Sequence, residues 1–334
     1  MAPRSIAVFA LEPWARDGAF PPDVVRRLAG LVDLDPDVTL TSFATPAALK
    51  ALAHTEILIS GWGCPRVDAG VLDAAPKLRA CVHAAGTVKN HLDPVVFERG
   101  LLVSSAAAAN AVPVAEYTIA AITLGAKRAF ARARAYAADP AVVARSPVDS
   151  GLLGCTVGVV GASRIGRLVL DGLRRLDVAV LLHDPYLTPR EARRLGAEPV
   201  TLDSLCRRSD LLTIHAPALP ETRHLLDDRR LALMPDGAVL INTARGSLVD
   251  TDALTRECAT GRISAVLDVT EPEPLPPGHP LLAMPNVFIT PHLAGAQGRE
   301  LRRLGEFATD EVGRLVRGEP LQGGVEAHQL TLNA

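Results

Sequence analysis

Four reactive side chains stand at or just beyond the ends of apolar runs in the second half of the chain. Arg245 follows "VLINTA", Asp268 lies within "VLDV" with Glu273 soon after it, and His292 closes "VFITPH". Such side chains hold an anion and move a proton. Taken singly, Arg245 fits a surface ion pair, Glu273 a solvated loop acid and His292 a structural histidine. In open parallel sheets, ligands bind beyond the carboxyl ends of the strands. Because all four side chains stand at such strand ends, we expect them to line one shared crevice.

A second candidate site is the stretch "TVGVVGASRIGRLVL", residues 156–170, which predicts a strand, a turn and a helix. Gly161 ends the strand, and Gly166 stands where a helix packs closely on a sheet. The N-terminus of that helix offers N–H groups and partial positive charge to a pyrophosphate. Ser163 occupies the middle position of the expected Gly-x-Gly-x-x-Gly, so a plain strand-turn-helix stays open as the alternative. The expected apolar helix face is Ile165, Leu168, Val169, Leu173 and Leu176.

The next apolar run ends in "VLLHDPY", which places Asp184 at the end of the second strand. An acid there accepts hydrogen bonds from both ribose hydroxyls of an adenosine and repels a 2′-phosphate. No arginine follows immediately. A lone Asp at a strand end is often only a cap, but together with the turn upstream it favours NAD over NADP.

Short apolar runs alternate with helical patterns along all 334 residues. This length favours two domains, and runs rich in Val, Ile and Leu predict parallel sheets covered by helices on both faces. The pattern predicts one long helix over 113–138, with Pro113 in its first turn, and an amphipathic helix over 297–316 that returns to the first domain. The expected strands are 5–11, 38–43, 57–62, 79–85 and 101–107 in the first part, and 156–161, 178–184, 210–216, 238–244, 264–269 and 286–292 in the second.

Composition argues against several other classes of protein. The net charge of −2 gives no reason to expect a nucleic acid or an acidic membrane surface as partner. Five widely spaced cysteines without a C-x-x-C pattern indicate neither a disulfide framework nor a zinc site, and the histidines lack metal-ligand spacing. No uninterrupted apolar run reaches the roughly 18 residues of a membrane span. We therefore expect no metal, no membrane contact and a cytoplasmic location.

Five motifs carry a resemblance to the D-isomer-specific 2-hydroxyacid dehydrogenases: "VGVVGASRIGR", "HAPALPETRHLL", "LINTARGSLVD", "AVLDVTEPEPLP" and "NVFITPHLAG". The stretch "AANAVPVAEYT" is similar to that family's entry to its inter-domain helix. The resemblance implies an α/β protein with two doubly wound parallel-sheet domains and a cleft between them. A Rossmann NAD-binding domain would span 108–295, and a smaller flavodoxin-like substrate domain would combine 1–107 with 296–334. It also implies NAD-dependent interconversion of a D-2-hydroxy acid and its 2-oxo acid. The long helix expected over 113–138 favours a homodimer.

The same resemblance assigns roles to single residues. Arg245 would hold the substrate carboxylate, His292 would be the general acid and base, and Glu273 would tune His292, with Glu271 as a near neighbour outside the family position. The backbone at Ala85 and Gly86 would take the substrate carboxylate, and Asn110 would face the substrate. The implied cofactor-binding residues are Gly161, Ser163, Arg164, Ile165, Gly166, Asp184, His215, Ala216, Pro217, Thr222, Thr243, Ala244 and Asp268.

Three stretches depart from the family pattern. Ser163 bears on the approach of the pyrophosphate, and "TVKNHLD" after Gly86 bears on the identity of the substrate. The loop "SGWGCPRVD" carries Trp62, which would be an apolar wall of the substrate site or would pack between domains. Its single arginine, Arg66, favours a substrate without a phosphate group. Two other functions stay open: an NAD(H)-binding regulatory module of corepressor type, and oxidation of a non-hydroxyacid donor such as formate or phosphite.

Overall fold

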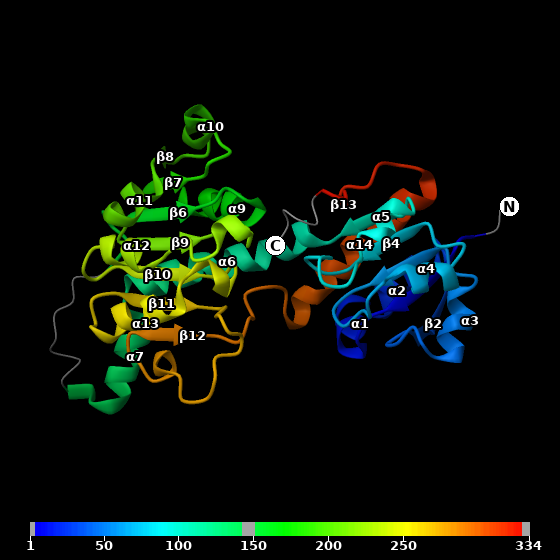
Figure 1. Ribbon diagram of the computed structural model, residues 1–334, viewed down its shortest axis with the longest axis horizontal. Coiled ribbons are helices and arrows are strands. Elements are labelled where there is room, and N and C mark those ends of the chain that lie inside the picture. Colours follow the sequence, from blue (N-terminus) through cyan, green and yellow to red (C-terminus); the bar gives the residue numbers. More distant parts are fainter. Residues whose placement is uncertain (1–3, 142–150, 329–334) are drawn as a thin grey trace. The chain divides into compact units, whose positions relative to one another are not determined.

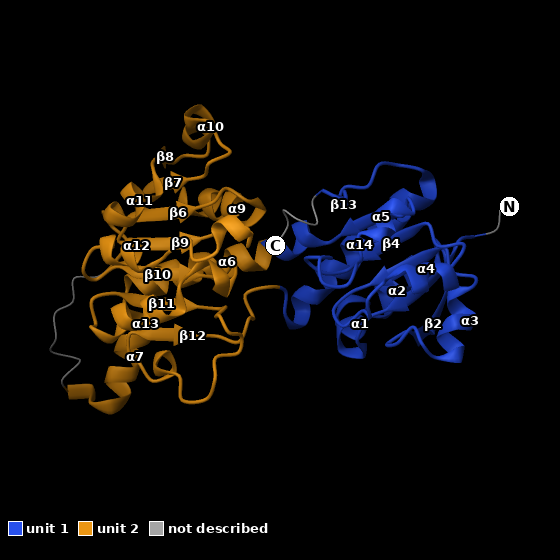
Figure 2. Ribbon diagram, viewed as in Figure 1, with its two compact units in different colours: residues 1–111, 296–333 blue, residues 112–295, 334 orange. Residues whose placement is uncertain are grey.

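The computed structural model describes residues 4–141 and 151–328. It divides into two compact units, which Figure 2 shows in different colours. Unit 1 combines residues 1–111 with 296–333, and unit 2 comprises residues 112–295. Helix α6 (Ala107–Ala126) contributes to both units, because the chain enters unit 2 after Ala111.

Unit 1 is built on a six-stranded sheet in the order β13-β5-β4-β3-β1-β2. Its parallel part has the flavodoxin-like order 2-1-3-4-5, and only β13 is antiparallel, to β5. Two apolar clusters cover the two faces: Val8 and Ala10 of β1 point to one, Ala7 and Phe9 to the other. The strands are β1 (Ile6–Ala10), β2 (Asp33–Thr39), β3 (Ile57–Ser60), β4 (Ala80–His83), β5 (Leu102–Ser105) and β13 (Gly324–Val325), and the helices are α1 (Pro13–Ala19), α2 (Pro22–Ala29), α3 (Pro46–Leu52), α4 (Ala69–Ala74), α5 (Val95–Glu98) and α14 (Leu301–Arg317).

Unit 2 is built on a seven-stranded parallel sheet in the order β12-β11-β10-β9-β6-β7-β8 (Figure 1). Its first six strands in chain order have the doubly wound Rossmann arrangement 3-2-1-4-5-6. Apolar clusters again lie on both faces of the sheet. The strands are β6 (Thr156–Val160), β7 (Ala179–His183), β8 (Glu198–Pro199), β9 (Leu211–Ile214), β10 (Val239–Asn242), β11 (Ser264–Leu267) and β12 (Val287–Ile289), and the helices besides α6 are α7 (Ala129–Ala138), α9 (Arg164–Leu173), α10 (Pro189–Arg194), α11 (Leu202–Arg208), α12 (Asp228–Leu233) and α13 (Thr251–Ala259). The fold-class prediction of two parallel-sheet α/β domains is confirmed.

Several sequence expectations were wrong in detail. The strand expected over 38–43 is β2, which ends at Thr39. The single helix expected over 113–138 is two helices, because Arg128 adopts a left-handed backbone conformation (φ 54°) between α6 and α7. Pro113 lies inside α6 and not in its first turn. Leu168 is exposed, and Leu170 takes its place on the buried face of α9.

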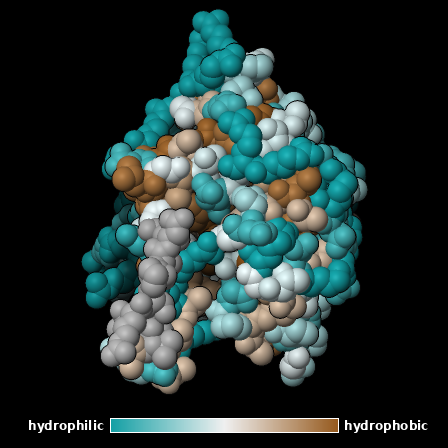
Figure 3. Space-filling model, turned by 90° about the vertical axis from the view of Figure 1, so that its left-hand side faces the viewer, coloured by the Kyte–Doolittle hydropathy of each residue, from teal (hydrophilic) through white to brown (hydrophobic). Residues whose placement is uncertain are grey.

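Helix α6 is the single helix of the described residues that is long and apolar enough to cross a membrane, judged by length and composition. The part of α6 that follows Ala111 packs into the core of unit 2 through Ala115, Ala121 and Ile122. Figure 3 views the side of the molecule formed by unit 2, where apolar residues come in small patches among hydrophilic ones. The projecting helix α10 is hydrophilic there, and of its residues only Ala192 is buried.

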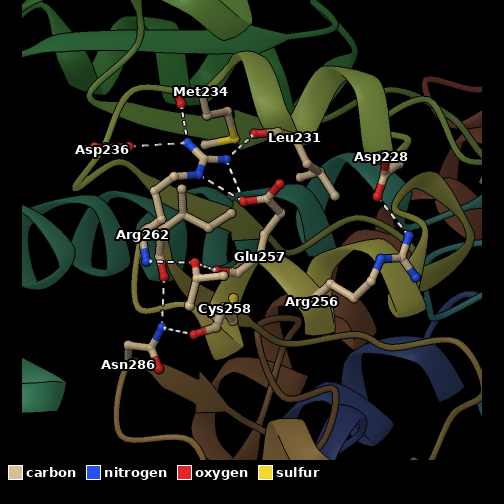
Figure 4. Close-up of polar contacts among 11 residues, drawn as sticks. Asp228, Leu231, Met234, Asp236, Arg256, Glu257, Cys258, Arg262 and Asn286 are labelled. Atoms are coloured by element: carbon tan, nitrogen blue, oxygen red, sulfur yellow. Dashed lines mark hydrogen bonds and ion pairs between the residues drawn. The ribbon is translucent and has the colours of Figure 1, made fainter.

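Away from the candidate site, Arg262 joins the ends of three elements of unit 2 (Figure 4). Its guanidinium donates to the carbonyl oxygens of Leu231 and Met234, and it pairs with Glu257 of α13 at 2.6 Å. Nearby, the Asn286 amide donates to the carbonyl oxygens of Cys258 and Ile263. Helix ends leave carbonyl groups without intrahelical donors, and Arg262 and Asn286 donate to carbonyl oxygens at the ends of α12 and α13.

Helix α14 completes unit 1 from the far end of the chain. It packs on α1 so closely that a Cβ atom on Gly305 would overlap the carbonyl oxygen of Ala19. Its buried Glu311 accepts hydrogen bonds from Ser104 of β5 and from the backbone N–H groups of Gln322 and Gly323. The prediction that the last helix returns to the first domain is therefore confirmed.

Candidate active site

The loop after β12 is held by Asp268, which follows β11. The Asp268 side chain is buried, and its Oδ1 accepts hydrogen bonds from the Thr290 hydroxyl at 2.6 Å and from the Leu293 N–H at 2.8 Å. Its Oδ2 accepts from the Ala294 N–H at 2.9 Å. The backbone N–H of His292 donates to the Asp268 carbonyl oxygen. These bonds fix His292 in a left-handed conformation (φ 52°) that few residues other than glycine adopt.

His292 meets Glu273 at a short distance. Its Nδ1 lies 2.6 Å from Oε1 of Glu273, and the two side chains are 49% and 41% exposed. Glu271, the neighbouring acid, turns elsewhere and pairs with Arg223 at 2.6 Å. The two acids of "TEPEP" therefore have different partners. Because Glu273 holds Nδ1 of His292, the other ring nitrogen, Nε2, is the one available to a substrate.

Arg245 follows β10 and is partly buried. Its guanidinium donates to the Ala244 carbonyl oxygen at 2.6 Å. Burial lowers the pKa of Arg245, and the nearby Glu273 carboxylate opposes that shift. Next in the chain, a Cβ atom on Gly246 would overlap the Thr270 carbonyl oxygen, so the loop that carries Arg245 lies directly against the loop that leads to Glu273. Unit 2 thus brings Arg245, Glu273 and His292 to one edge of its sheet.

The turn between β6 and α9 has the geometry that its glycines predict. Gly161 has φ +92°, and a Cβ atom on Gly166 would overlap the Gly161 carbonyl oxygen. Ser163 is the N-cap residue of α9, and its hydroxyl oxygen accepts a hydrogen bond from the Gly166 N–H at 3.3 Å. Among the described residues, the N–H groups of Arg164 and Ile165 have no acceptor. They form a helix N-terminus that is open to an anion.

Asp184 lies just after β7 and is joined to this turn. Its Oδ2 accepts a hydrogen bond from the Ala162 N–H at 2.7 Å, and its Oδ1 accepts from the Tyr186 N–H at 2.8 Å. Each carboxylate oxygen has two lone pairs, so one on each oxygen stays free for a hydroxyl donor. The two backbone hydrogen bonds therefore fix the orientation of the Asp184 carboxylate.

Three polar side chains predicted to line the cofactor have partners of their own. The Thr222 hydroxyl donates to the Pro217 carbonyl oxygen, and the Thr243 hydroxyl lies 2.8 Å from that of Thr118. His215 is buried after β9, with Nε2 3.0 Å from the Thr213 hydroxyl, and its Nδ1 has no partner among the described residues. Burial lowers the pKa of His215 to about 3. Of the neighbours named with them, Ala216 and Ala244 are buried and Pro217 is half-buried.

Unit 1 brings together three of its four predicted site residues. A Cβ atom on Gly86 would lie 3.3 Å from Nδ2 of Asn110, and Oδ1 of Asn110 accepts a hydrogen bond from the Ala296 N–H. Within the described part of the chain, the N–H groups of Ala85 and Gly86 have no acceptor. Two adjacent free N–H groups beside a side-chain amide suit a carboxylate.

The fourth residue, Trp62, packs within unit 1 against its apolar clusters. Its ring stacks on Trp14, with ring centroids 5.9 Å apart and an interplanar angle of 18°. Trp14 is 58% exposed and was missed by the sequence reasoning, although it closely follows the first strand in "LEPWARD". Arg66 of the same loop pairs with Asp93 at 2.8 Å.

Residues 120–294 match the family described as D-isomer specific 2-hydroxyacid dehydrogenase, NAD binding domain. The chain belongs to the D-isomer-specific 2-hydroxyacid dehydrogenase family. It is 35% identical to a glyoxylate reductase of Thermofilum pendens over 76% of each chain. It is 31% identical to a D-3-phosphoglycerate dehydrogenase of Methanocaldococcus jannaschii, over 84% of this chain and 53% of that one. The solved TT0316 protein of Thermus thermophilus is 34% identical, with a TM-score of 0.74 over 96% of this chain and 99% of that one.

The first relatives are longer proteins, since the chain spans about half the length of the phosphoglycerate dehydrogenases that it matches. The match covers the family's NAD-binding domain. The residues of unit 2 fit NAD as the cofactor. The close approach of Gly166 to Gly161, the free N–H groups of α9 and the aimed carboxylate of Asp184 together form a cradle for a dinucleotide. NAD is the cofactor that this part of the chain binds.

Proposed function

We propose that the protein is an NAD-dependent oxidoreductase that interconverts a D-2-hydroxy acid and its 2-oxo acid. The observation that carries the proposal is the 2.6 Å pairing of Glu273 with His292, beside the partly buried Arg245. Bound NAD supplies the hydride acceptor or donor. What remains for the protein is to hold a carboxylate, to orient the carbonyl and to move one proton.

Each of these tasks falls to a named group. The planar guanidinium of Arg245 holds the substrate carboxylate through paired hydrogen bonds. Nε2 of His292 gives a proton to the carbonyl oxygen during reduction and takes the hydroxyl proton during oxidation. Glu273 holds Nδ1, so the ring presents its other nitrogen.

Other residues position the two reactants. The free N–H groups of Ala85 and Gly86 bind the substrate carboxylate, with the Asn110 amide beside them. The N–H groups of Arg164 and Ile165 bind the pyrophosphate, and Asp184 binds the adenosine ribose and disfavours NADP. Thr222, Thr243 and His215 shape the loops of the cofactor site. Asp268 fixes the loop that presents His292.

The substrate we propose is a 2-oxo acid without a phosphate group, because Arg66 is already paired with Asp93. We assign Trp62 as an apolar wall of the substrate site, with its ring stacked on that of Trp14. A homodimer in the cytoplasm, without nucleic acid or membrane as partner, completes the proposal.

The test is NADH oxidation by the purified protein with 2-oxo acids from glyoxylate and hydroxypyruvate to branched and aromatic examples. We expect turnover that Arg245→Ala abolishes. NADH binding without turnover on any 2-oxo acid would contradict the proposal and favour a regulatory NAD(H)-binding module. Reduction of NAD by formate or phosphite alone would instead favour a relative with another donor.

A further inference from the structure

Two consecutive residues of α6, Tyr117 and Thr118, contact loops at the carboxyl ends of two different strands of unit 2. The Tyr117 hydroxyl lies 2.8 Å from that of Thr290, which directly follows β12. The Thr118 hydroxyl lies 2.8 Å from that of Thr243, which directly follows β10. Consecutive side chains of a helix point about 100° apart around its axis, so each reaches a different neighbour. The chemistry proposed above uses neither Tyr117 nor Thr118.

The contact of Tyr117 begins a directional series of hydrogen bonds. A hydroxyl has one proton to donate, and that of Thr290 goes to Oδ1 of Asp268 at 2.6 Å. The Tyr117 hydroxyl is therefore the donor to Thr290, and burial raises the pKa of Tyr117, so this proton stays in place at neutral pH. The Asp268 carboxylate also accepts the two backbone N–H groups that follow His292 in the sequence. The series that starts on α6 thus ends at the group that fixes the His292 loop.

The contact of Thr118 is directional as well. Its hydroxyl donates to the Val114 carbonyl oxygen one turn earlier, at 2.8 Å, so its oxygen is the acceptor for the Thr243 hydroxyl. Both threonines are buried, and a buried hydroxyl that loses its acceptor is costly. Beside this contact, the Asn242 amide donates to the Arg245 carbonyl oxygen at 2.8 Å. The backbone that carries Arg245 is therefore tied both to β10 and to α6.

The two threonines occupy equivalent places in their loops. Thr243 stands two positions before Arg245, and Thr290 stands two positions before His292. Each residue has two free backbone dihedral angles, so one intervening residue leaves little freedom between an anchored threonine and the reactive side chain. Helix α6 therefore holds the anchors of both reactive side chains.

We propose that consecutive residues of α6 position two different groups of the reaction. Tyr117 positions His292, through the threonine two places before it. Thr118 positions Arg245 in the same way. The inference rests on the proposed function, which gives the proton transfer to His292 and the substrate carboxylate to Arg245. Because these are different tasks, loss of the two hydroxyl groups must change different kinetic constants.

The test compares Tyr117→Phe with Thr118→Val, since each substitution removes one hydroxyl and nearly keeps the shape of the side chain. Tyr117→Phe should lower kcat about 10-fold, as expected for the loss of about one hydrogen bond, and change the KM for the 2-oxo acid less than about 2-fold. Thr118→Val should raise that KM about 10-fold and change kcat less than about 3-fold. Steady-state kinetics on the full chain with NADH measures both constants.

Two further variants separate the hydrogen bonds from packing. Thr118→Ser keeps the hydroxyl and should restore KM to within about 3-fold of the wild-type value. Thr123→Val is the matched control, because the Thr123 hydroxyl of the same helix donates to the Ile119 carbonyl oxygen within α6. Its kcat and KM should equal those of the wild-type protein.

Three kinetic results would overturn the proposal. One is an equal change of kcat and of KM in Tyr117→Phe and Thr118→Val, which would reduce both residues to packing. Another is a change in Thr123→Val as large as theirs, and the third is a KM in Thr118→Ser as high as in Thr118→Val. If Thr118→Val does not fold, Tyr117→Phe decides alone, and a wild-type kcat in that variant would refute the positioning of His292.

A readout without turnover separates this inference from the proposed function. Hydrogen exchange should quicken in peptides covering residues 288–294 in Tyr117→Phe and in those covering 242–247 in Thr118→Val, and in neither in Thr123→Val. If the wild-type protein reduces no 2-oxo acid, the proposed function fails, while the exchange rates still decide whether α6 holds the two loops. Unchanged exchange in both variants of an active enzyme would refute the inference alone.

Discussion

Glu273 Oε1 lies 2.6 Å from His292 Nδ1, although both side chains are nearly half exposed. A contact between two polar side chains that water reaches so freely contributes little to stability, typically below about 1 kcal/mol. Its short contact is therefore better explained by the orientation of the imidazole ring than by support of the fold.

Glu273→Gln should accordingly lower kcat by about 10²-fold and leave the melting temperature and the Kd for NADH unchanged. Glu271→Gln is the matched control, because this acid stands two positions earlier and pairs with Arg223. Steady-state kinetics and calorimetry on both variants give the answer. A similar loss of kcat in both would assign the effect to the loop as a whole.

Asp184 gives a prediction about cofactor choice. Both carboxylate oxygens are aimed by backbone N–H groups, of Ala162 and Tyr186, so the negative charge is fixed at the end of β7. Asp184→Ser should raise the KM for NADH and lower that for NADPH, shifting their ratio by about 10-fold or more, since one charge repulsion of roughly 1.4 kcal/mol is removed. Steady-state kinetics with NADH and NADPH test this. An unchanged ratio of the two KM values would show that other groups bind the ribose hydroxyls.

The turn before α9 predicts opposite results for two neighbouring positions. Ser163 is a helix cap, and its replacement by glycine should cost only a few tenths of a kcal/mol of unfolding free energy. We expect Ser163→Gly to leave the Kd for NADH within about 3-fold, a change below about 1 kcal/mol. Gly166→Ala would force a Cβ atom into the Gly161 carbonyl, so it should abolish NADH binding. Fluorescence titration of NADH distinguishes the two, and a large gain in affinity for Ser163→Gly would mean that the hydroxyl obstructs the pyrophosphate.

Two buried histidines, His83 and His215, and the half-buried His91 predict how stability depends on pH. Burial lowers the pKa of His91 to about 4 and that of His215 to about 3, and it lowers the pKa of His83 well below its usual range. An unfolded chain binds protons at these histidines below about pH 6.5, while the folded chain does not, so stability falls as the pH drops from about 6.5 toward 4.

Urea unfolding between pH 7.5 and 4.5 should show this decline. His91→Leu should flatten it by an amount on the order of 2 kcal/mol across the window, since one pKa unit corresponds to about 1.4 kcal/mol. Carboxylates held by arginines, such as Asp203 with its pKa lowered to about 2, act only at lower pH. An identical pH dependence in the variant would mean that His91 is protonated in the folded protein.

The sequence revealed most of the parallel architecture, because β-branched and leucine-rich runs mark strands that are buried on both faces. It did not reveal the break at Arg128, since alanine-rich residues on both sides of it favour helix equally. The two-residue strand β13 was also missed, because its pairing to β5 is set by tertiary contacts and not by a local pattern. The alternation of apolar and polar residues could not predict β2 either, because only Leu34 of this strand is buried.

For the candidate site, strand ends predicted where Arg245, Asp268 and His292 would lie, because parallel strands share a carboxyl edge. The polar contacts that hold these residues in place could not be predicted from the sequence. The hydrogen bonds of Asp268 to Thr290, Leu293 and Ala294 depend on loop geometry that no spacing encodes. Trp14 was overlooked for the same reason, since its stacking on Trp62 joins helix α1 to a loop that lies far from it in the sequence.

Helix α14 and strand β13 follow unit 2 in the sequence, yet they complete unit 1, whose other strands precede unit 2. On the ribosome, residues 1–111 are therefore made before α14, which covers part of one sheet face over β4 and β5, and before β13, which pairs with β5. Unit 2 is continuous in sequence and can close first. A nascent chain arrested after Gly295 should thus yield a protease-resistant unit 2 and a digestible N-terminal segment, so the order of synthesis and the order of folding differ in this protein.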